Sequence, residues 1–218
     1  ELPDIVRFQA LREFSEVSDN WPIDFLVDKS TGEQIHVKAA ALSPKKFADY
    51  QKVCEKAGLK CVGLMLRPTA SAVILAKRAD KEQETVSLVI DLSGRTAEIT
   101  VLTGQDVQLM REVRVTAEPG SIEQRELLLG EIRRTLSAAR NQFHADVERV
   151  VILGSAAESV DLVDLIKQQL SLRVDVINPL ETGSAGSRLS ASAVTSPGRY
   201  AAGIGMLSEL VSKDRQSI

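Results

Sequence analysis

The chain is poor in the residue types that mark several large classes of protein. Aromatic residues make up 4% of its 218 positions, and acidic residues outnumber basic ones to give a net charge of −3. A nucleic-acid surface needs stacking aromatic side chains or a basic patch, so nucleic acid is not an expected partner. No apolar run reaches the roughly 18 residues of a membrane-spanning helix, so no direct membrane span is expected.

Cysteine and histidine are scarce as well, with two of each. Cys54 and Cys61 form no Cys-x-x-Cys pair, and His36 and His144 lie far apart without a spaced partner. This spacing disfavours zinc and favours a reducing, cytoplasmic setting. The motifs of serine hydrolases, zinc proteases and P-loop proteins are missing too. The rest of the composition, 44% hydrophobic and 26% charged, is that of an ordinary globular protein.

The first 66 residues have the pattern of a small α+β unit. Hydrophobic periodicity predicts a helix, two strands, a helix and a strand, at residues 2–14, 21–28, 34–42, 43–57 and 59–66. Ser43-Pro44 supplies the cap and first-turn residues of the second helix. Gly58 follows that helix in the position that favours glycine.

The remaining sequence alternates strands with helices. The expected elements are a helix at 68–79 capped by Thr69, a hairpin at 86–102, a strand at 106–115, a helix at 122–143, a strand at 149–153, a helix at 159–171, a strand at 174–176, a loop at 180–198 and a helix at 199–212. The strand, glycine turn, helix and strand that begin at Arg149 predict a right-handed parallel βαβ unit.

The hairpin at 86–102 has two interpretations. Asp91, Gly94 and Thr96 surround one short turn, and these residue types favour turns for purely local reasons. They could equally form a phosphate-facing loop, in which Thr96 donates a hydroxyl and Asp91 holds a metal or water. Gly154-Ser155 is similarly open, because it suits either a plain strand-to-helix turn or a phosphate site at a helix N-terminus.

The predicted helix at 122–143 carries a row of basic side chains opposite its apolar stripe. Arg125, Arg133 and Arg140 form this row. It is consistent with a partner-binding face, although a solvated amphipathic face explains it as well.

The order of these pieces resembles the second half of the actin-like ATPase fold, which actin, Hsp70, FtsA and PilM share. The N-terminal unit is similar to subdomain 1C of FtsA and PilM, and Cys54–Leu59 matches a phrase common in the PilM family. The resemblance implies an α/β fold with an α+β N-terminal unit: an actin-like, ribonuclease H-like mixed sheet with a small 1C-like subdomain. The implied divisions are a 1C-like subdomain at 1–66, a linking helix and charged connector at 67–85, and an actin-like second half at 86–218.

The resemblance also implies a nucleotide site. The second phosphate loop would be the hairpin turn, the adenosine-side turn would follow the strand at 149–153, and part of the long helix would contact the adenosine. The residues carried over are Asp91, Ser93, Gly94, Arg95, Thr96, Arg133, Arg134, Ser137, Gly154 and Ser155, with Asp91 as the magnesium ligand.

Three departures set the functional expectation. The first phosphate loop is absent, Ala156 and Ala157 replace glycines of the adenosine-side turn, and the subdomain between hairpin and long helix is cut to 111–121. Half a phosphate cradle has too few converging donors to hold Mg-ATP well. No cofactor is therefore expected, although the chain begins at Glu1 rather than Met, and a phosphate loop upstream would make ATP and magnesium possible.

The resulting expectation is a scaffold rather than an enzyme. By resemblance to PilM, it would be cytoplasmic and peripheral to the inner membrane of a type IV pilus or type II secretion platform. Its partner would be the cytoplasmic tail of a PilN-like bitopic membrane protein, bound in a groove between the first unit and the following body, with self-association left open. The alternatives are an ATP-binding actin-like ATPase or polymer former and, with less support, a sugar or acetate kinase relative.

Overall fold

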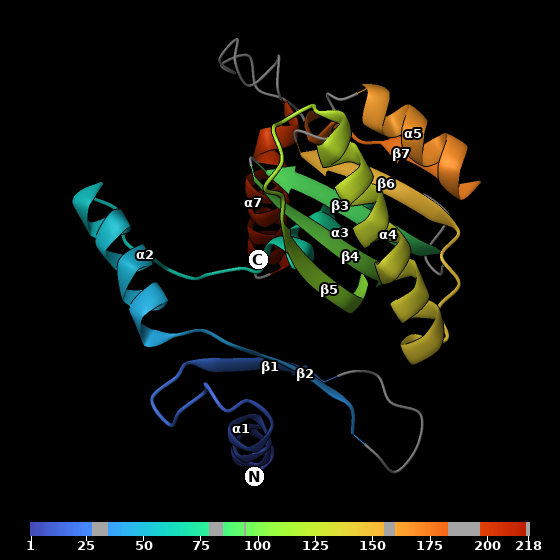
Figure 1. Ribbon diagram of the computed structural model, residues 1–218. Helices are drawn as coiled ribbons and strands as arrows, with labels where there is room; N and C mark the ends of the chain where they lie inside the picture. The colour runs from blue at the N-terminus through green and yellow to red at the C-terminus, as the bar shows by residue number, and fades with distance from the viewer. Residues whose placement is uncertain (28–34, 79–84, 94, 155–159, 183–196, 217–218) are drawn as a thin grey trace. The chain divides into compact units, whose positions relative to one another are not determined.

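The computed structural model describes residues 1–27, 35–78, 85–93, 95–154, 160–182 and 197–216 (Figure 1). The chain divides into two compact units, Glu1–Leu64 and Met65–Ile218. No helix within the described ranges is long and apolar enough to cross a membrane.

The first unit pairs one helix with a two-stranded sheet and continues into a second helix. Its elements are α1 (Leu2–Glu13), β1 (Ile23–Val27), β2 (Val37–Ala41) and α2 (Pro44–Lys56). Strands β1 and β2 are antiparallel, with Phe25 opposite Ala39. Val6 and Ala10 are the buried side chains of α1. The Arg7 guanidinium donates to the backbone carbonyls of Asp19 and Trp21, at 2.9 and 3.3 Å, and so ties α1 to the approach to β1.

Helix α2 begins and ends as its sequence predicts. The Ser43 hydroxyl accepts a hydrogen bond from the Lys46 amide at 3.3 Å, and Gly58 adopts a φ of +70° after the last turn. The strand predicted at 59–66 is wrong, because these residues pair with no strand in the described part of the chain. An apolar run needs a partner ladder to become a strand. Without one, Leu59 and Val62 remain 65% and 82% exposed.

The second unit is built on a mixed five-stranded sheet. Its strands are β3 (Val86–Ser93), β4 (Thr96–Thr103), β5 (Asp106–Arg114), β6 (Arg149–Gly154) and β7 (Arg173–Val176), in the spatial order β5-β4-β3-β6-β7. Strands β3, β4 and β5 form an antiparallel meander, whereas β3, β6 and β7 run parallel. The predicted hairpin, third strand and parallel βαβ unit are therefore confirmed, as is the mixed α/β sheet.

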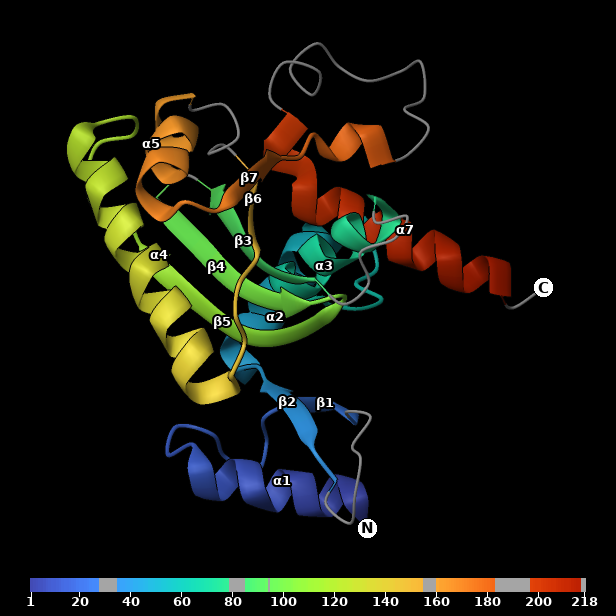
Figure 2. The ribbon, with the colours of Figure 1, turned by 90° about the vertical axis from the view of Figure 1, so that its right-hand side faces the viewer.

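Helices cover both faces of this sheet (Figure 2). Helices α4 (Ile122–Phe143) and α5 (Val160–Leu170) lie on one face, and α3 (Arg67–Arg78) and α7 (Ala201–Gln216) lie on the other. Two short 3₁₀ helices, η2 (Pro179–Thr182) and η3 (Pro197–Tyr200), precede α7. Because α3 already begins at Arg67, Thr69 lies inside its first turn, and the predicted cap at Thr69 is wrong.

Alternation along the strands gives the sheet a separate apolar core on each face. Leu88 and Ile90 of β3 pack with Leu128 and Ile132 of α4. Val89 lies on the opposite face, in a cluster with residues of α3, β6 and α7. Side chains of β6 enter both clusters, as expected of a strand that is buried on both faces.

The basic row of α4 is engaged within the second unit. Arg125 pairs with Asp161, and Arg133 donates to Gln169 at 2.9 Å, so both contact α5. Arg140 pairs with Asp146 at 2.7 Å beyond the end of the helix. These contacts account for the row without a partner protein.

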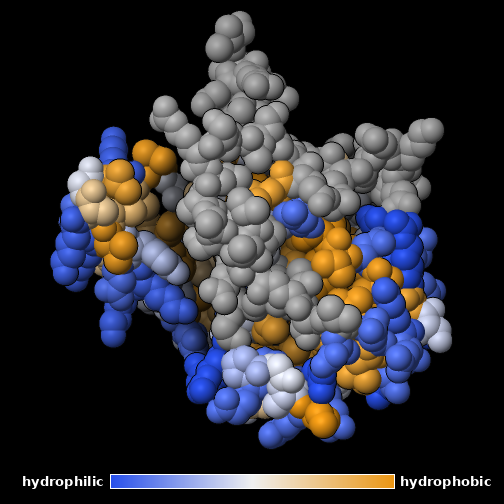
Figure 3. Space-filling model, turned by 90° about the horizontal axis from the view of Figure 1, so that it is seen from above, coloured by the Kyte–Doolittle hydropathy of each residue, from blue (hydrophilic) through white to orange (hydrophobic). Residues whose placement is uncertain are grey.

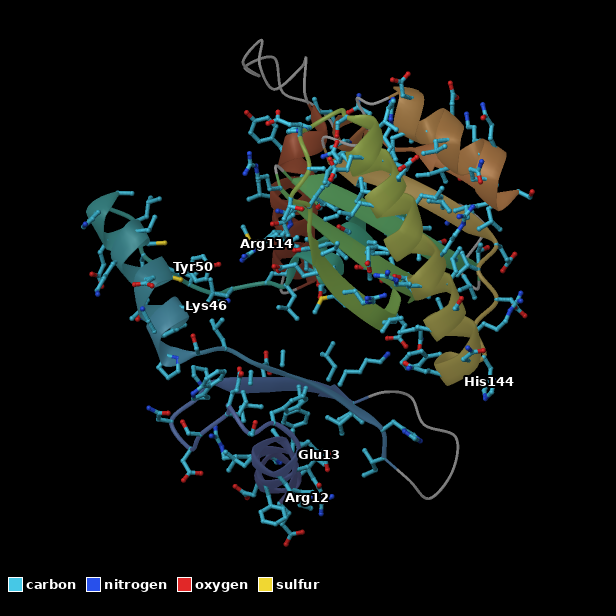
Figure 4. All side chains as sticks on the ribbon, viewed as in Figure 1. Arg12, Glu13, Lys46, Tyr50, Arg114 and His144 are labelled. Atoms are coloured by element: carbon cyan, nitrogen blue, oxygen red, sulfur yellow. The ribbon has the colours of Figure 1, made fainter. Side chains whose placement is uncertain are left out.

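Helix α4 ends at a residue under backbone strain. His144, labelled in Figure 4, caps the helix at a φ of 52°, in the left-handed region that glycine adopts most easily. We expect His144→Gly to raise the free energy of unfolding by about 0.5–1 kcal/mol, measured by urea denaturation. His36→Gly, in an exposed part of the first unit, is the comparison. Equal stability of wild type and His144→Gly would contradict the strain.

Candidate functional site

The predicted phosphate turn lies where β3 and β6 both end. These strands are parallel, so their carboxyl ends meet at one edge of the sheet. Gly154, the last residue of β6, is opposite Leu92 of β3, and Ser93 is opposite Thr96 across the turn. The structure thus brings Asp91, Ser93, Thr96 and Gly154 to the same edge. Gly94, Ser155 and the Ser93 side chain lie outside the described residues.

Arg95 is exposed beside this turn, and its carbonyl accepts a hydrogen bond from the Val115 amide at 2.7 Å. The bond ties the turn to the end of β5. Arg95 therefore lies beside the predicted turn, and its backbone carbonyl connects that turn to the end of β5.

The predicted adenosine contacts on α4 are not brought to this edge. Helix α5 follows the carboxyl end of β6, but Arg133 contacts Gln169, close to the other end of α5. The eleven residues of α5 span roughly 16 Å. Arg133 is therefore about one length of α5 away from the turn. Arg134 pairs with Glu131 one turn earlier, and Ser137 is exposed.

A row of three carboxylates crosses the sheet next to the turn. Asp91 of β3 is opposite Glu98 of β4, and Glu98 is opposite Glu112 of β5. Directly opposed residues share a face of an antiparallel sheet, so the three acids are neighbours there. The sequence prediction included Asp91 alone. Alternation along β4 puts Glu98 on the other face of the sheet from Ala97 and Ile99, and this pattern could have revealed the row.

Arg67, the first residue of α3, supplies the positive charge for this row. Its Nη2 donates to Asp91 Oδ2 at 2.6 Å, and its Nε lies 3.5 Å from Glu98 Oε1. Asp91 is 3% exposed, the Glu98 side chain 15% and the Arg67 side chain 38%. Asp91 Oδ1 and Glu98 Oε2 are buried without a hydrogen-bond partner. The acid row and Arg67 thus form a partly buried cluster with more negative than positive charge.

Burial and charge shift the protonation of this cluster. Burial raises the pKa of Glu98, and the carboxylates of Asp91 and Glu112 raise it further, while Arg67 opposes them. Burial lowers the pKa of Arg67, but its hydrogen bond to Asp91 and the acidic charges outweigh that effect and raise it. Arg67 therefore stays charged, and folding favours the protonated form of Glu98.

We expect Glu98→Gln to stabilise the protein most at neutral pH. Because the pKa of Glu98 is raised above its ordinary 4.5 on folding, its stabilising contribution is complete below pH 4.5 and is lost as pH rises through the folded value. The variant should gain little near pH 4 and more near pH 7 in urea denaturation. Glu126→Gln, at an exposed site on α4, should show no such trend. Lower stability of Glu98→Gln at neutral pH would contradict the assignment.

The first unit holds a second candidate site. A cavity of about 370 Å³ opens beside the end of α1 and the β2 strand. Its lining combines apolar side chains with two acids: Glu13, Phe14, Ser15, Glu16, Val17, Trp21, Ala39 and Ala41. Glu13 pairs with Arg12 at 3.1 Å (Figure 4), and Glu16 is exposed. This mixture suits a ligand that is apolar at one point and basic nearby.

Comparison with solved structures identifies the fold. No protein-family model and no curated protein sequence matches the chain. A PilM–PilN type IV pilus biogenesis complex is similar at a TM-score of 0.78 and 22% identity, over 94% of this chain and 70% of that one. MreB5 of Spiroplasma citri bound to ADP is similar at a TM-score of 0.50 and 10% identity, over 80% and 68% of the two chains. The chain therefore has a PilM-like fold of the actin-like ATPase class.

Proposed function

We propose that this protein is a scaffold of a type IV pilus or type II secretion platform that binds the cytoplasmic tail of a PilN-like membrane protein. The observation that carries the proposal is the likeness, over 94% of the chain, to a structure solved as a PilM–PilN complex. In this role the protein is cytoplasmic, is held at the inner membrane by its partner and does not hydrolyse ATP.

The cavity of the first unit is the binding site that we propose for the tail. Cytoplasmic segments next to a membrane span are rich in lysine and arginine. The carboxylates of Glu13 and Glu16 complement such a segment, while Phe14, Val17 and Trp21 offer an apolar pocket to one of its side chains. The site therefore suits a short tail that carries an apolar anchor beside basic residues.

The β1–β2 sheet offers a further mode of attachment. Within the first unit each of these strands pairs only with the other in the described residues, so each keeps one edge outside that ladder. An extended peptide can add to such an edge through backbone hydrogen bonds, with pockets for alternate side chains. Leu26 and Val27 of β1 are 70% and 52% exposed, which gives an added strand apolar neighbours.

Apolar side chains are also exposed on the second helix of this unit. Helix α2 has no buried side chain, and Val53 is 67% exposed. Figure 3 shows apolar surface on this part of the molecule, at the left of the view. Figure 4 shows Lys46 and Tyr50 on neighbouring turns of the same helix. Contiguous exposed apolar surface commonly marks an interaction site, which agrees with a scaffold role.

The test is calorimetric titration of the chain with a peptide that spans the tail of a PilN-like protein. We expect a dissociation constant of tens of micromolar or below. Ala39→Arg places a bulky cation in the cavity and should weaken binding by at least about tenfold. Glu16→Lys should weaken binding less than Ala39→Arg does. Its effect should be larger at low salt than at high salt, because added salt screens the charges at the rim of the cavity.

Asp4→Lys is the matched control, because it reverses an exposed acid of the same unit that lies neither on α2 nor in the lining of the cavity. It should leave binding unchanged. Two results would overturn the proposal: no binding near 100 μM peptide, or equal affinities of the wild type and Ala39→Arg.

The alternative of an ATP-binding protein has one observation in its favour, the gathering of Asp91, Ser93, Thr96 and Gly154 at one sheet edge. It predicts that Mg-ATP at 100 times its dissociation constant stabilises the protein by about 2.7 kcal/mol. Thermal denaturation with and without Mg-ATP separates this alternative from the scaffold, for which no stabilisation is expected.

A further inference from the structure

We propose that the Arg67 guanidinium acts as a built-in cation at Asp91 and keeps divalent metal ions out of the hairpin turn. The resemblance to actin-like ATPases assigns Asp91 to magnesium. In this chain, the geometry around Asp91 assigns that carboxylate to a side chain of the same unit.

The contact between Arg67 and Asp91 is short and enclosed. Nη2 lies 2.6 Å from Oδ2, slightly shorter than the roughly 2.7–2.9 Å that is usual for a charge-assisted N–H···O hydrogen bond, and Asp91 is 3% exposed. Arg67 is the first residue of α3, which packs against α7 and the sheet, so the backbone that carries the guanidinium is held in place. The pair is therefore a fixed element of the fold.

The surroundings of Asp91 do not fit magnesium. Magnesium requires nearly octahedral oxygen ligands and usually keeps several of its waters. With the Arg67 guanidinium in place, Asp91 is 3% exposed, which leaves little room for such waters, and one carboxylate oxygen already accepts from Arg67. In the wild-type arrangement of the described residues, no group of three or more histidine, cysteine, aspartate or glutamate side chains is placed to hold a metal ion.

The same acid row would attract a cation if Arg67 were removed. Asp91, Glu98 and Glu112 lie side by side, and Arg67 contacts the first two. Asp91 Oδ1 and Glu98 Oε2 are buried without a hydrogen-bond partner, so both oxygens are free to coordinate a cation. Loss of the guanidinium would leave neighbouring carboxylates without their positive charge, in a partly buried place where charge interactions are strong. The cluster should then bind a divalent ion that the wild type excludes.

Manganese binding provides the test, because Mn²⁺ accepts the same oxygen ligands as magnesium and free Mn²⁺ is counted by electron paramagnetic resonance. The wild type should bind none below about 1 mM at this site. Arg67→Met should bind Mn²⁺ at least about tenfold more tightly than the wild type, and Mn²⁺ should raise its melting temperature. Adding Asp91→Asn to Arg67→Met should abolish both effects.

Arg67→Lys is the conservative control, since it keeps a cation beside Asp91 and should bind Mn²⁺ as poorly as the wild type. If Arg67→Met does not fold, Arg67→Gln replaces it as a neutral variant that retains a hydrogen-bond donor. A folded neutral variant that gains no Mn²⁺ site overturns the proposal. A second result would also overturn it: the wild type binds Mn²⁺ with a dissociation constant below 1 mM, and Asp91→Asn abolishes that binding. This second measurement requires no Arg67 variant to fold.

Discussion

Replacing Gly205 by alanine is expected to lower the free energy of unfolding by about 2–3 kcal/mol. Gly205 lies where α7 crosses α3, and a Cβ atom there would stand 2.1 Å from the Ala70 carbonyl oxygen and 2.7 Å from its carbon. Both are backbone atoms of a helix, so no side-chain rotation can relieve the overlap. The two helices would have to move apart, and contacts in the buried cluster that includes Ile74 and Ala201 would be lost.

Gly203 supplies a matched control in the same helix. It is exposed, and a Cβ atom at this position would meet nothing within 4 Å. Gly203→Ala should therefore raise stability by about 0.5–1 kcal/mol, because alanine is the better helix former. Urea denaturation of both variants should give changes of opposite sign. Equal effects would show that helix propensity, rather than the close approach to Ala70, governs both sites.

Replacing Arg67 by methionine is expected to cost about 2–3 kcal/mol of stability. Breaking a buried ion pair from one side typically costs about 3–5 kcal/mol, and the 38% exposure of the Arg67 side chain lowers that figure. The cost arises because the Asp91 carboxylate is left buried without its counter-charge. Asp91→Asn in the Arg67→Met background should recover part of the loss, so a double-mutant cycle measures the coupling.

The Arg140–Asp146 pair is a control of nearly equal length. Its atoms are 2.7 Å apart, against 2.6 Å for Arg67 and Asp91, but both of its side chains are 75% exposed. Arg140→Met should stay within about 0.5 kcal/mol of the wild type. The two pairs have nearly equal lengths and differ in burial, so the comparison isolates the effect of burial. If Arg67→Met lowers the free energy of unfolding no more than Arg140→Met does, burial does not have the role given to it here.

The sequence was most informative where local signals determine structure. Helix α4 begins and ends at the predicted residues, because Ser121 caps its start through the Gln124 amide and apolar side chains recur at helical spacing. The hairpin was predictable because alternation along 96–102 fits a sheet with an apolar core on each face. The mixed sheet followed from the resemblance to the actin-like fold together with the βαβ pattern.

The missed features depend on contacts between distant parts of the chain. Arg67 reaches Asp91 across 24 residues, and periodicity within either element contains no sign of that pair. The predicted strand at 59–66 had an apolar pattern but no neighbouring ladder. The assignment of Arg133 and Ser137 to the nucleotide came from the resemblance and stays a prediction, while the contact of Arg133 with Gln169 of α5 could not be read from periodicity. Which groups meet was therefore the hardest question to answer from sequence.

The mixed direction of the strands has a consequence for how the second unit assembles. Strands β3, β4 and β5 are consecutive and joined by short turns, so their meander can form early from contacts close in sequence. Strand β6 pairs with the other side of β3 across a longer stretch of chain that contains the 22 residues of α4, so this contact has the higher loop-closure cost. Until it forms, β3 presents an open apolar edge on which another partly folded copy can dock. The β3 edge that β6 covers is thus a place where an incompletely folded chain would be prone to aggregation.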